Sequence, residues 1–199
     1  MKQLLLGSNN AGKLAELKRM LEPLGFDVVG ARQAGVELDV VEDEATFIGN
    51  AKKKAREFAE ASRLLTLADD SGLEVDALGG APGVLSARFS GPDATDASNN
   101  ALLLERLHGV EARTARFQCA LALASAAGEI LHVTTGTIEG RILDTPRGHE
   151  GFGYDPLFLP VGSAQTMAEL SAEAKGSISH RGRAFAQMRQ WLSERRLNF

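Results

Sequence analysis

Cysteine is almost absent from this chain, whose 199 residues include one, Cys119. A single cysteine excludes an intrachain disulfide, so the fold has to be held together by its core. Cys119 lies in the alternating run 115–124, which favours a buried strand residue over a catalytic nucleophile. This cysteine usage fits a reducing compartment, and we expect a cytoplasmic protein.

Long apolar runs and an excess of positive charge are also missing. No stretch approaches the ~20 apolar residues of a membrane-spanning helix, and residues 1–7 become polar too soon for a signal peptide. The 22 basic and 26 acidic residues give a net charge of −4, which excludes the basic surface typical of proteins that bind nucleic-acid polymers. A single small anion bound in a local pocket is still compatible with this balance.

The apolar pattern predicts one α/β or α+β domain over residues 1–199, with a mixed sheet. The chain is 44% hydrophobic and long enough to bury a sizeable core. Helical spacing predicts helices over 11–24, 47–62, 97–107 and about 180–197. Short apolar runs predict strands over 4–7, 64–68, 115–124, 129–136 and 157–159, of which 115–124 and 129–136 would form a hairpin.

Two further segments receive a local interpretation. Thr166 to Glu169 matches the capping box that opens a helix. The run Lys52–Lys54 lies within the predicted helix 47–62, and such charge runs usually form a solvated helix face.

The segment Asp69-Asp70-Ser71-Gly72 follows the predicted strand 64–68 directly. Adjacent carboxylates repel one another, and a bound cation relieves that repulsion. Asp, Ser and Gly are also ordinary turn formers. On this segment alone, a metal site at the end of a strand and a simple turn are equally good interpretations. Asp69 is the weaker metal candidate, because neighbouring strand residues point to opposite faces.

The segment Gly7 to Lys13 fits the first seven positions of a phosphate-binding P-loop and joins a strand to a helix. The eighth position is Leu14, which cannot ligate the magnesium that a P-loop NTPase holds with Ser or Thr. The chain is therefore not expected to be such an NTPase. A helix N-terminus followed by Lys13 still favours an anion, although a polar turn with a solvated lysine is a serious alternative.

Three other clusters carry groups that could bind a nucleotide. Phe152-Gly153-Tyr154-Asp155 offers two rings, of which one could stack on a base and the other belong to the core. Lys175 stands in a small, polar stretch, and His180-Arg181 opens the last predicted helix. Glu42 belongs to an acidic run, a kind of segment that is usually solvated.

Taken together and in this order, these segments resemble the inosine triphosphate pyrophosphatase family, the dITP/XTP pyrophosphatases. The matching pieces span nearly the whole chain: 8–13, Glu42 with 46–47, 68–73, 79–83, 86–91, 151–156 and 177–181. The chain departs from the family in Ser8-Asn9-Asn10, where Thr-Gly-Asn is common. It also has Ala174 in place of an acid before Lys175, which removes a possible charge partner.

The resemblance implies an elongated, two-lobed α/β fold with a long mixed central sheet flanked by helices, an active-site cleft between the lobes, and a homodimer. It implies Mg2+-dependent hydrolysis of deaminated purine nucleoside triphosphates (dITP, ITP, XTP and dXTP) to the monophosphate and pyrophosphate. Asp70 would be the general base and, with Glu42, a metal ligand. The implied substrate-binding residues are Ser8, Asn9, Asn10, Ala11, Gly12, Lys13, Ser71, Phe152, Gly153, Tyr154, Asp155, Lys175, His180 and Arg181.

Two alternatives share most of these residues. One is a nucleotide pyrophosphatase that acts on modified pyrimidines through the same metal chemistry. The other is a nucleotide-binding sensor without hydrolysis, which could dispense with Glu42 and Asp70.

Overall fold

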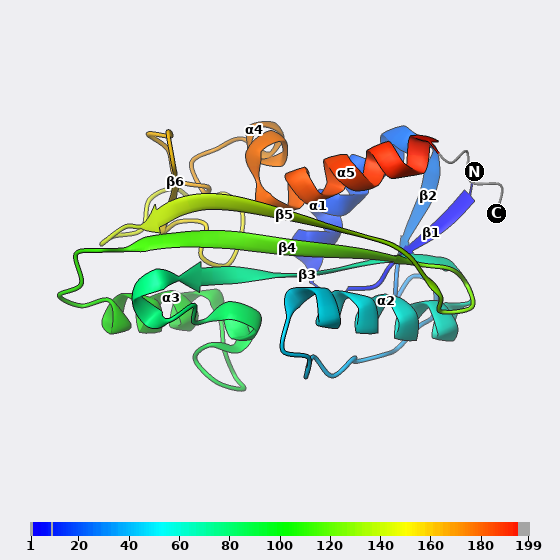
Figure 1. The fold of residues 1–199 in the computed structure, drawn as a ribbon, viewed down its shortest axis with the longest axis horizontal. Coiled ribbons are helices and arrows are strands. Elements are labelled where there is room, and N and C mark those ends of the chain that lie inside the picture. The colour runs from blue at the N-terminus through cyan, green and yellow to red at the C-terminus, as the bar shows by residue number, and fades with distance from the viewer. Residues whose placement is uncertain (1, 9, 195–199) are drawn as a thin grey trace. The chain divides into compact units, whose positions relative to one another are not determined.

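The computed structural model describes residues 2–8 and 10–194, and its strands form one six-stranded sheet (Figure 1). The strand order is β2-β1-β3-β4-β5-β6. Strand β1 pairs in parallel with β2 and β3, whereas β5 and β6 are antiparallel, so the predicted α/β class with a mixed sheet is confirmed. The strands are β1 (Lys2–Leu6), β2 (Phe26–Gly30), β3 (Leu65–Val75), β4 (Thr114–Ala124), β5 (Ile130–Ile142) and β6 (Phe158–Pro160).

The α-helices are α1 (Ala11–Leu21), α2 (Phe47–Ser62), α3 (Asp96–Arg106), α4 (Ala172–Ile178) and α5 (His180–Glu194). Strands and α-helices alternate along the described residues as far as α3, after which β4, β5 and β6 follow one another and α4 and α5 come last. Short 3-10 helices cover Glu22–Leu24, Asp76–Leu78 and Gly83–Arg88. Within the described ranges, no helix is both long enough and apolar enough to span a membrane.

The chain divides into two compact units, and the boundary within β3 falls between Asp70 and Ser71. Unit 1 comprises the residues up to Asp70, Cys119–Gly136 and the residues from Arg183 onward. Unit 2 comprises Ser71–Gln118 and Thr137–Gly182.

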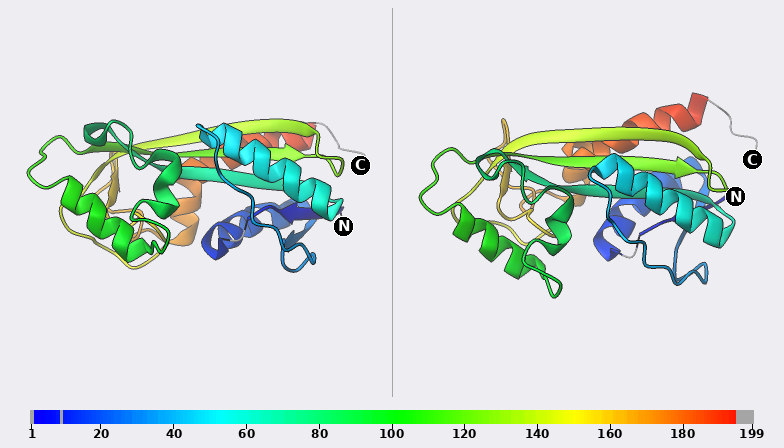
Figure 2. Two further views of the ribbon diagram at one scale, coloured as in Figure 1. Left: turned by 90° about the horizontal axis from the view of Figure 1, so that it is seen from below. Right: turned by 60° about the horizontal axis from the view of Figure 1, so that its bottom comes forward.

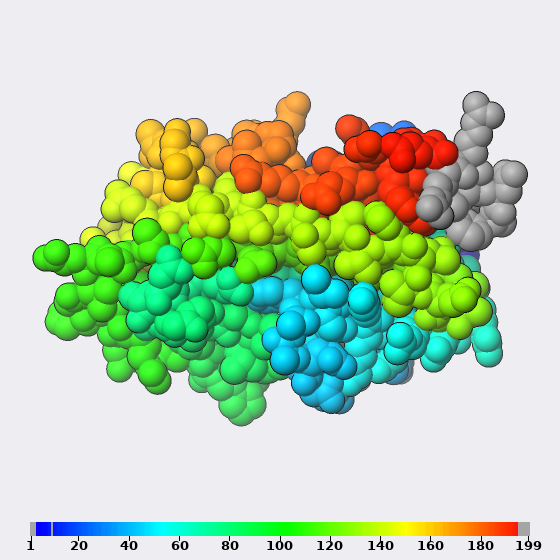
Figure 3. All heavy atoms as spheres, viewed as in Figure 1, coloured from blue at the N-terminus to red at the C-terminus, as the bar shows by residue number. Residues whose placement is uncertain are grey.

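Unit 1 packs helices on both faces of its strands, as the views in Figures 1 and 2 agree. Leu4 and Leu6 of β1 point into a core with α1 and α5, which also buries Cys119 as expected for a strand residue. Leu5, on the opposite face, packs with Phe58 of α2. This alternation is the period of two of a strand buried on both faces. In Figure 3 the outer surface of α2 forms a cyan band.

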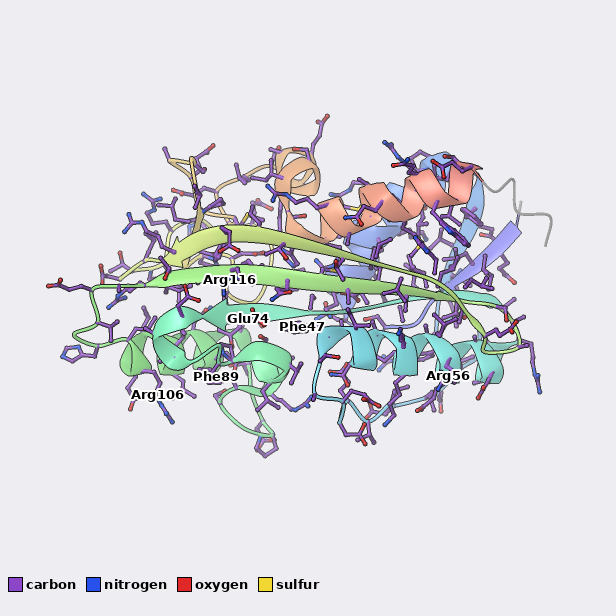
Figure 4. The ribbon with its side chains drawn as sticks, viewed as in Figure 1. Phe47, Arg56, Glu74, Phe89, Arg106 and Arg116 are labelled. Atoms are coloured by element: carbon purple, nitrogen blue, oxygen red, sulfur yellow. The ribbon has the colours of Figure 1, made fainter. Side chains whose placement is uncertain are left out.

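Unit 2 has its own apolar core. Residues of β3, β4 and β5 pack there against α3 and the segment around β6. Among them are Leu73, Leu103, Phe117 and Phe158. The strands of this unit also carry charges, such as Glu74 on β3 and Arg116 on β4, labelled in Figure 4, whose side chains lie 3.9 Å apart.

Several predicted boundaries need correction. The helix expected over 11–24 ends at Leu21, because Pro23 follows and a 3-10 turn with the left-handed Gly25 closes it. The strand expected over 64–68 continues to Val75. No helix begins at the capping-box match: Thr166 donates its N–H to Glu169, but its hydroxyl bonds to the Arg147 carbonyl oxygen. The expected end of the last helix at 197 lies outside the described residues.

Candidate active site

The segment that leads from the end of β1 into α1 contains a capped helix N-terminus. The Asn10 side chain accepts a hydrogen bond from the Lys13 N–H at 3.0 Å, and Ser8 Oγ accepts one from the Asn10 N–H at 3.2 Å. A Cβ at Gly7 would lie 2.9 Å from the Phe58 ring, so glycine allows β1 to end against α2. Ala11, Gly12 and Lys13 form the first turn of α1, which presents the positive end of a helix. Asn9 lies outside the described residues.

Asp69 and Asp70 lie inside β3 rather than in a turn, and each pairs with a lysine from a different helix. Asp69 is fully buried and lies 3.2 Å from Lys13 Nζ of α1. Asp70 accepts a bond from Lys54 Nζ of α2 at 3.0 Å. Because α1 and α2 cover opposite faces, the two carboxylates point in opposite directions. The expected alternation of Asp69 and Asp70 along the strand is thus present.

Glu42 and Asp70 converge on the ammonium of Lys54, and we call these three residues the lysine–carboxylate cluster. Lys54 Nζ lies 2.6 Å from Glu42 Oε1 and 3.0 Å from Asp70 Oδ1. Asn50, one turn before Lys54 on α2, donates to Asp70 Oδ2 at 3.1 Å and accepts the Glu44 N–H at 3.0 Å. Asn50 therefore ties the acidic loop before α2 to β3.

Lys54 corrects the prediction that Lys52–Lys54 is a solvated face. Lys52 is exposed and Lys53 pairs with exposed Asp43, but Lys54 is 7% exposed. A signal existed in the sequence, since 50 and 54 fall on the same helical stripe as the apolar positions 47, 51, 55 and 58. Polar residues on an otherwise buried stripe point to a built polar site.

Burial and charge oppose each other in this cluster. Burial raises the pKa of the Asp70 carboxyl above its ordinary value, and the nearby Lys54 and Lys13 ammonium groups counteract it only in part. Burial would lower the pKa of Lys54, but the carboxylates of Asp70, Asp69 and Glu42 together outweigh it and raise that pKa. Lys54 is therefore cationic at neutral pH.

The lysine–carboxylate cluster fits a divalent cation. Its three formal charges sum to −1 because one ammonium faces two carboxylates, and both carboxylates direct an oxygen at Lys54 Nζ, which leaves the cluster one negative charge in excess. Mg2+ is typically held by one or two carboxylates, with waters and substrate phosphates completing its octahedron. The described residues contain no group of three or more His, Cys, Asp and Glu side chains arranged for a metal, so a cage made wholly of protein is not present there.

A second polar group in unit 2 surrounds Phe152, and we call Phe152, Asp155, Lys175 and Arg181 the Phe152 cluster. Lys175 Nζ lies 2.5 Å from Asp155 Oδ2, which also accepts the Phe152 N–H at 2.9 Å. Lys175 Nζ and Arg181 Cζ lie 5.0 and 5.6 Å from the centre of the half-buried Phe152 ring. Arg181 also donates to Ser71 Oγ at 2.9 Å.

The structure separates the roles of the two rings in this segment. Tyr154 is buried in the core of unit 2, and its hydroxyl donates to the Ser86 carbonyl oxygen at 2.8 Å. Phe152 is thus the ring left for stacking. His180 is buried with its ring stacked on Phe117 at 4.9 Å. Lys175 does have a charge partner, Asp155, although the acid expected before it is replaced by Ala174.

Close contact between the ends of α4 and α5 places His180 and Arg181 next to Lys175. A Cβ at Gly182 would lie 1.9 Å from the Gly176 carbonyl oxygen. Ser179 caps α5 by accepting the Gly182 N–H at 3.0 Å. Only glycine at 182 allows this approach.

We expect Gly182→Ala to lower the free energy of unfolding by about 1–3 kcal/mol, as overpacking does. Thermal unfolding measures this change. Gly162→Ala is a matched control because a Cβ there meets nothing within 4 Å, although its φ of +79° adds some strain. Equal stability of Gly182→Ala and the wild type would show that the two helices are not in this contact.

Each unit therefore gathers part of the predicted set. Unit 1 holds Ser8, Asn10 to Lys13, Glu42 and Asp70, and unit 2 holds Ser71, the segment 152–155, Lys175, His180 and Arg181. The prediction missed Asn50 and Lys54.

Comparisons with known proteins agree along nearly the whole chain. The sequence profile of the Ham1 family matches residues 4–191. A dITP/XTP pyrophosphatase of an Exiguobacterium species is 51% identical over 94% of this chain and 94% of its own, and one of Bacillus subtilis is 43% identical over 96% and 98%.

Solved structures give the same result. A HAM1 protein from Coxiella burnetii is 40% identical, covers 98% of this chain and 100% of its own, and superimposes with a TM-score of 0.87. A nucleoside-triphosphatase (dITP/XTP pyrophosphatase) from Mycobacterium abscessus is 47% identical. It covers 94% of this chain and 98% of its own, with a TM-score of 0.74. The resemblance seen in the sequence motifs is confirmed, and the chain belongs to the Ham1 family.

Proposed function

We propose that this protein is a Mg2+-dependent nucleoside triphosphate pyrophosphohydrolase. It hydrolyses dITP, ITP, XTP and dXTP to the monophosphate and pyrophosphate, and so removes them from the nucleotide pool before they enter DNA or RNA. The observation that carries this proposal is the convergence of Glu42 and Asp70 on the ammonium of Lys54, which brings the two carboxylates together, in a chain 43% and 51% identical to two proteins named dITP/XTP pyrophosphatase.

Glu42 and Asp70 would hold the magnesium ion. When bound, the ion supplies positive charge that offsets the charge of the triphosphate. Ser8, Asn9, Asn10 and the first turn of α1 (Ala11, Gly12, Lys13) would bind phosphate oxygens, because a helix N-terminus presents N–H groups and positive potential to an anion.

Asp70 would act as the general base. Its carboxylate is held by two donors, Lys54 and Asn50, and burial raises its pKa above the ordinary value, the direction that makes a carboxylate a better proton acceptor. Asp70 takes a proton from the attacking water, the water oxygen bonds to the α-phosphorus, and the bond from that phosphorus to the bridging oxygen breaks. Pyrophosphate leaves with the electron pair of that bond.

The purine base of the nucleotide would be recognised by the Phe152 cluster together with Ser71, Gly153, Tyr154 and His180. The Phe152 ring supplies a stacking face, and Lys175 and Arg181 supply cationic donors. Hypoxanthine and xanthine present a 6-oxo acceptor, whereas adenine presents an amino donor. A site built around that hydrogen bond can reject adenine by ~10⁴-fold or more. Tyr154 would act by anchoring the loop, since its ring is buried.

We expect Phe152→Ala to raise the KM for ITP by about 5–150-fold, since stacking of a base on an aromatic ring contributes ~1–3 kcal/mol. Inhibition by inorganic triphosphate, which has no base, should not change. Steady-state kinetics with both compounds measure the difference. Phe152→Tyr keeps a stacking ring and serves as the control. An unchanged KM in Phe152→Ala would place base stacking elsewhere.

A cytoplasmic location and a homodimer complete the proposal. Sedimentation of the purified chain tests the homodimer. Family membership supports both statements, and the single buried Cys119 fits a reducing compartment.

Product analysis tests the activity itself. The purified protein is incubated with ITP, dITP and XTP beside dATP and dGTP, with and without Mg2+. Monophosphate and pyrophosphate, formed only with magnesium and mainly from the deaminated purines, is the expected result. Release of orthophosphate would overturn the proposed reaction, and equal hydrolysis of dATP or dGTP would overturn the proposed substrate class. Binding without products would identify a sensor.

A further inference from the structure

Two side chains of α3 bind both backbone polar groups of Gly153. Asp96 Oδ2 accepts a hydrogen bond from the Gly153 N–H at 2.7 Å, and Asn100 Nδ2 donates one to the Gly153 carbonyl oxygen at 2.9 Å. Asp96 and Asn100 are four residues apart, so they project from one face of the helix. The bond to Asp96 is charge-assisted, which makes it stronger than an ordinary amide bond.

Gly153 is the residue that follows the Phe152 ring. Its φ of +63° is a left-handed conformation, which the bonds to α3 fix in one orientation. On either side, Asp155 Oδ2 accepts the Phe152 N–H and the Tyr154 hydroxyl bonds to Ser86. Hydrogen bonds therefore fix the backbone on which the half-buried Phe152 ring stands. The two bonds from α3 hold Gly153, the middle residue of this segment.

Asn100 makes its bond at a cost. Its Oδ1 is buried without a hydrogen-bond partner in the part of the chain that the structure describes. An unpartnered buried oxygen is unfavourable, so this amide contributes little to net stability. Positioning of the loop at Gly153 explains this side chain better than stabilisation of the fold does.

We infer that Asp96 and Asn100 are positioning residues for purine recognition, holding the Phe152–Gly153 segment in the geometry in which the Phe152 ring receives the base. This inference rests on the proposed function. It adds two residues of α3 that contact the loop rather than the nucleotide. Displacement of a binding group by about 1 Å can cost up to ~10²-fold.

The test compares a ligand that has a base with one that has none. We expect Asp96→Ala and Asn100→Ala each to raise the KM and the Kd for ITP about 10-fold, with kcat changed less than about 3-fold. The inhibition constant of inorganic triphosphate should stay within about twofold of wild type. Asp96→Asn keeps an acceptor for the Gly153 N–H and should restore most of the affinity. Glu105→Ala, at an exposed position of the same helix, should behave as wild type.

The double variant adds a further criterion. Both side chains hold the same residue, Gly153, so we expect their effects to be non-additive. Asp96→Ala/Asn100→Ala should bind ITP only slightly more weakly than the poorer of the two single variants. Equal weakening of ITP and inorganic triphosphate, or unchanged affinity for ITP in both single variants, would overturn the inference. A wild-type protein that binds ITP without turnover would overturn the proposed function, while the Kd comparison would still decide the role of Asp96 and Asn100.

Discussion

Replacing Asp70 by asparagine is expected to lower kcat for ITP by about 10²–10⁴-fold, the range that a general base contributes. Asparagine has nearly the same shape but cannot accept the proton of the attacking water. It also leaves one of the two donors that now bond to Asp70, Lys54 and Asn50, facing an amide NH2 group. Single-turnover kinetics at saturating ITP and Mg2+ measure the loss of the chemical step.

Binding of ITP should survive this substitution better than turnover does, since the Phe152 cluster and the first turn of α1 are unchanged. A Kd for ITP within about tenfold of wild type would separate loss of the base from loss of the site. Asp43→Asn is the matched control, because Asp43 is an exposed acid that pairs with Lys53 outside the lysine–carboxylate cluster. If Asp70→Asn retained near-wild-type kcat, Asp70 would not be the base.

Helix α2 shows where sequence reasoning succeeds. Its predicted bounds, 47–62, are those of the structure, because local signals at its start coincide with its burial pattern. Thr46 accepts the Gly49 N–H at 3.0 Å as an N-cap, and the buried side chains repeat at helical spacing. Local chemistry and tertiary packing agree in this element.

Strand β3 shows where local reasoning fails. Asp-Asp-Ser-Gly is a good turn sequence, and the strand was expected to end at Ala68. It continues to Val75 because Lys13 and Lys54, from helices on opposite faces, neutralise the two buried carboxylates. Those partners are 56 and 16 residues away along the chain, so no local window contains both.

The Phe152 cluster likewise depends on contacts between residues that are distant in the sequence. Ala174 removes one possible charge partner of Lys175 from the sequence. The partner is Asp155, twenty residues earlier, in the loop that also carries Phe152. Likewise, the hydrogen bonds of Gly153 to α3 join residues more than fifty positions apart. A single sequence shows which groups are present, whereas the fold decides which of them meet.

Lys54→Met is expected to lower the free energy of unfolding by about 3–5 kcal/mol without Mg2+, the cost of removing one partner from a buried ion pair. Methionine fills a similar volume but leaves Glu42 and Asp70 without the cation on which both converge, and Asp70 is 4% exposed. Chemical denaturation measures the change. Lys52→Met, on the exposed face of the same helix, should differ from wild type by less than about 0.5 kcal/mol.

Two further measurements decide whether the loss of stability in Lys54→Met comes from the lost positive charge. One adds Mg2+, and the other adds a second substitution. Because a divalent cation can replace the lost ammonium, Mg2+ should raise the Tm of Lys54→Met more than that of the wild type. Glu42→Gln added to Lys54→Met removes one of the two opposed carboxylates, so the double variant should be more stable than Lys54→Met alone. If neither magnesium nor Glu42→Gln recovered stability, Lys54 would act through packing of its side chain, and the two carboxylates would not form a common cation site.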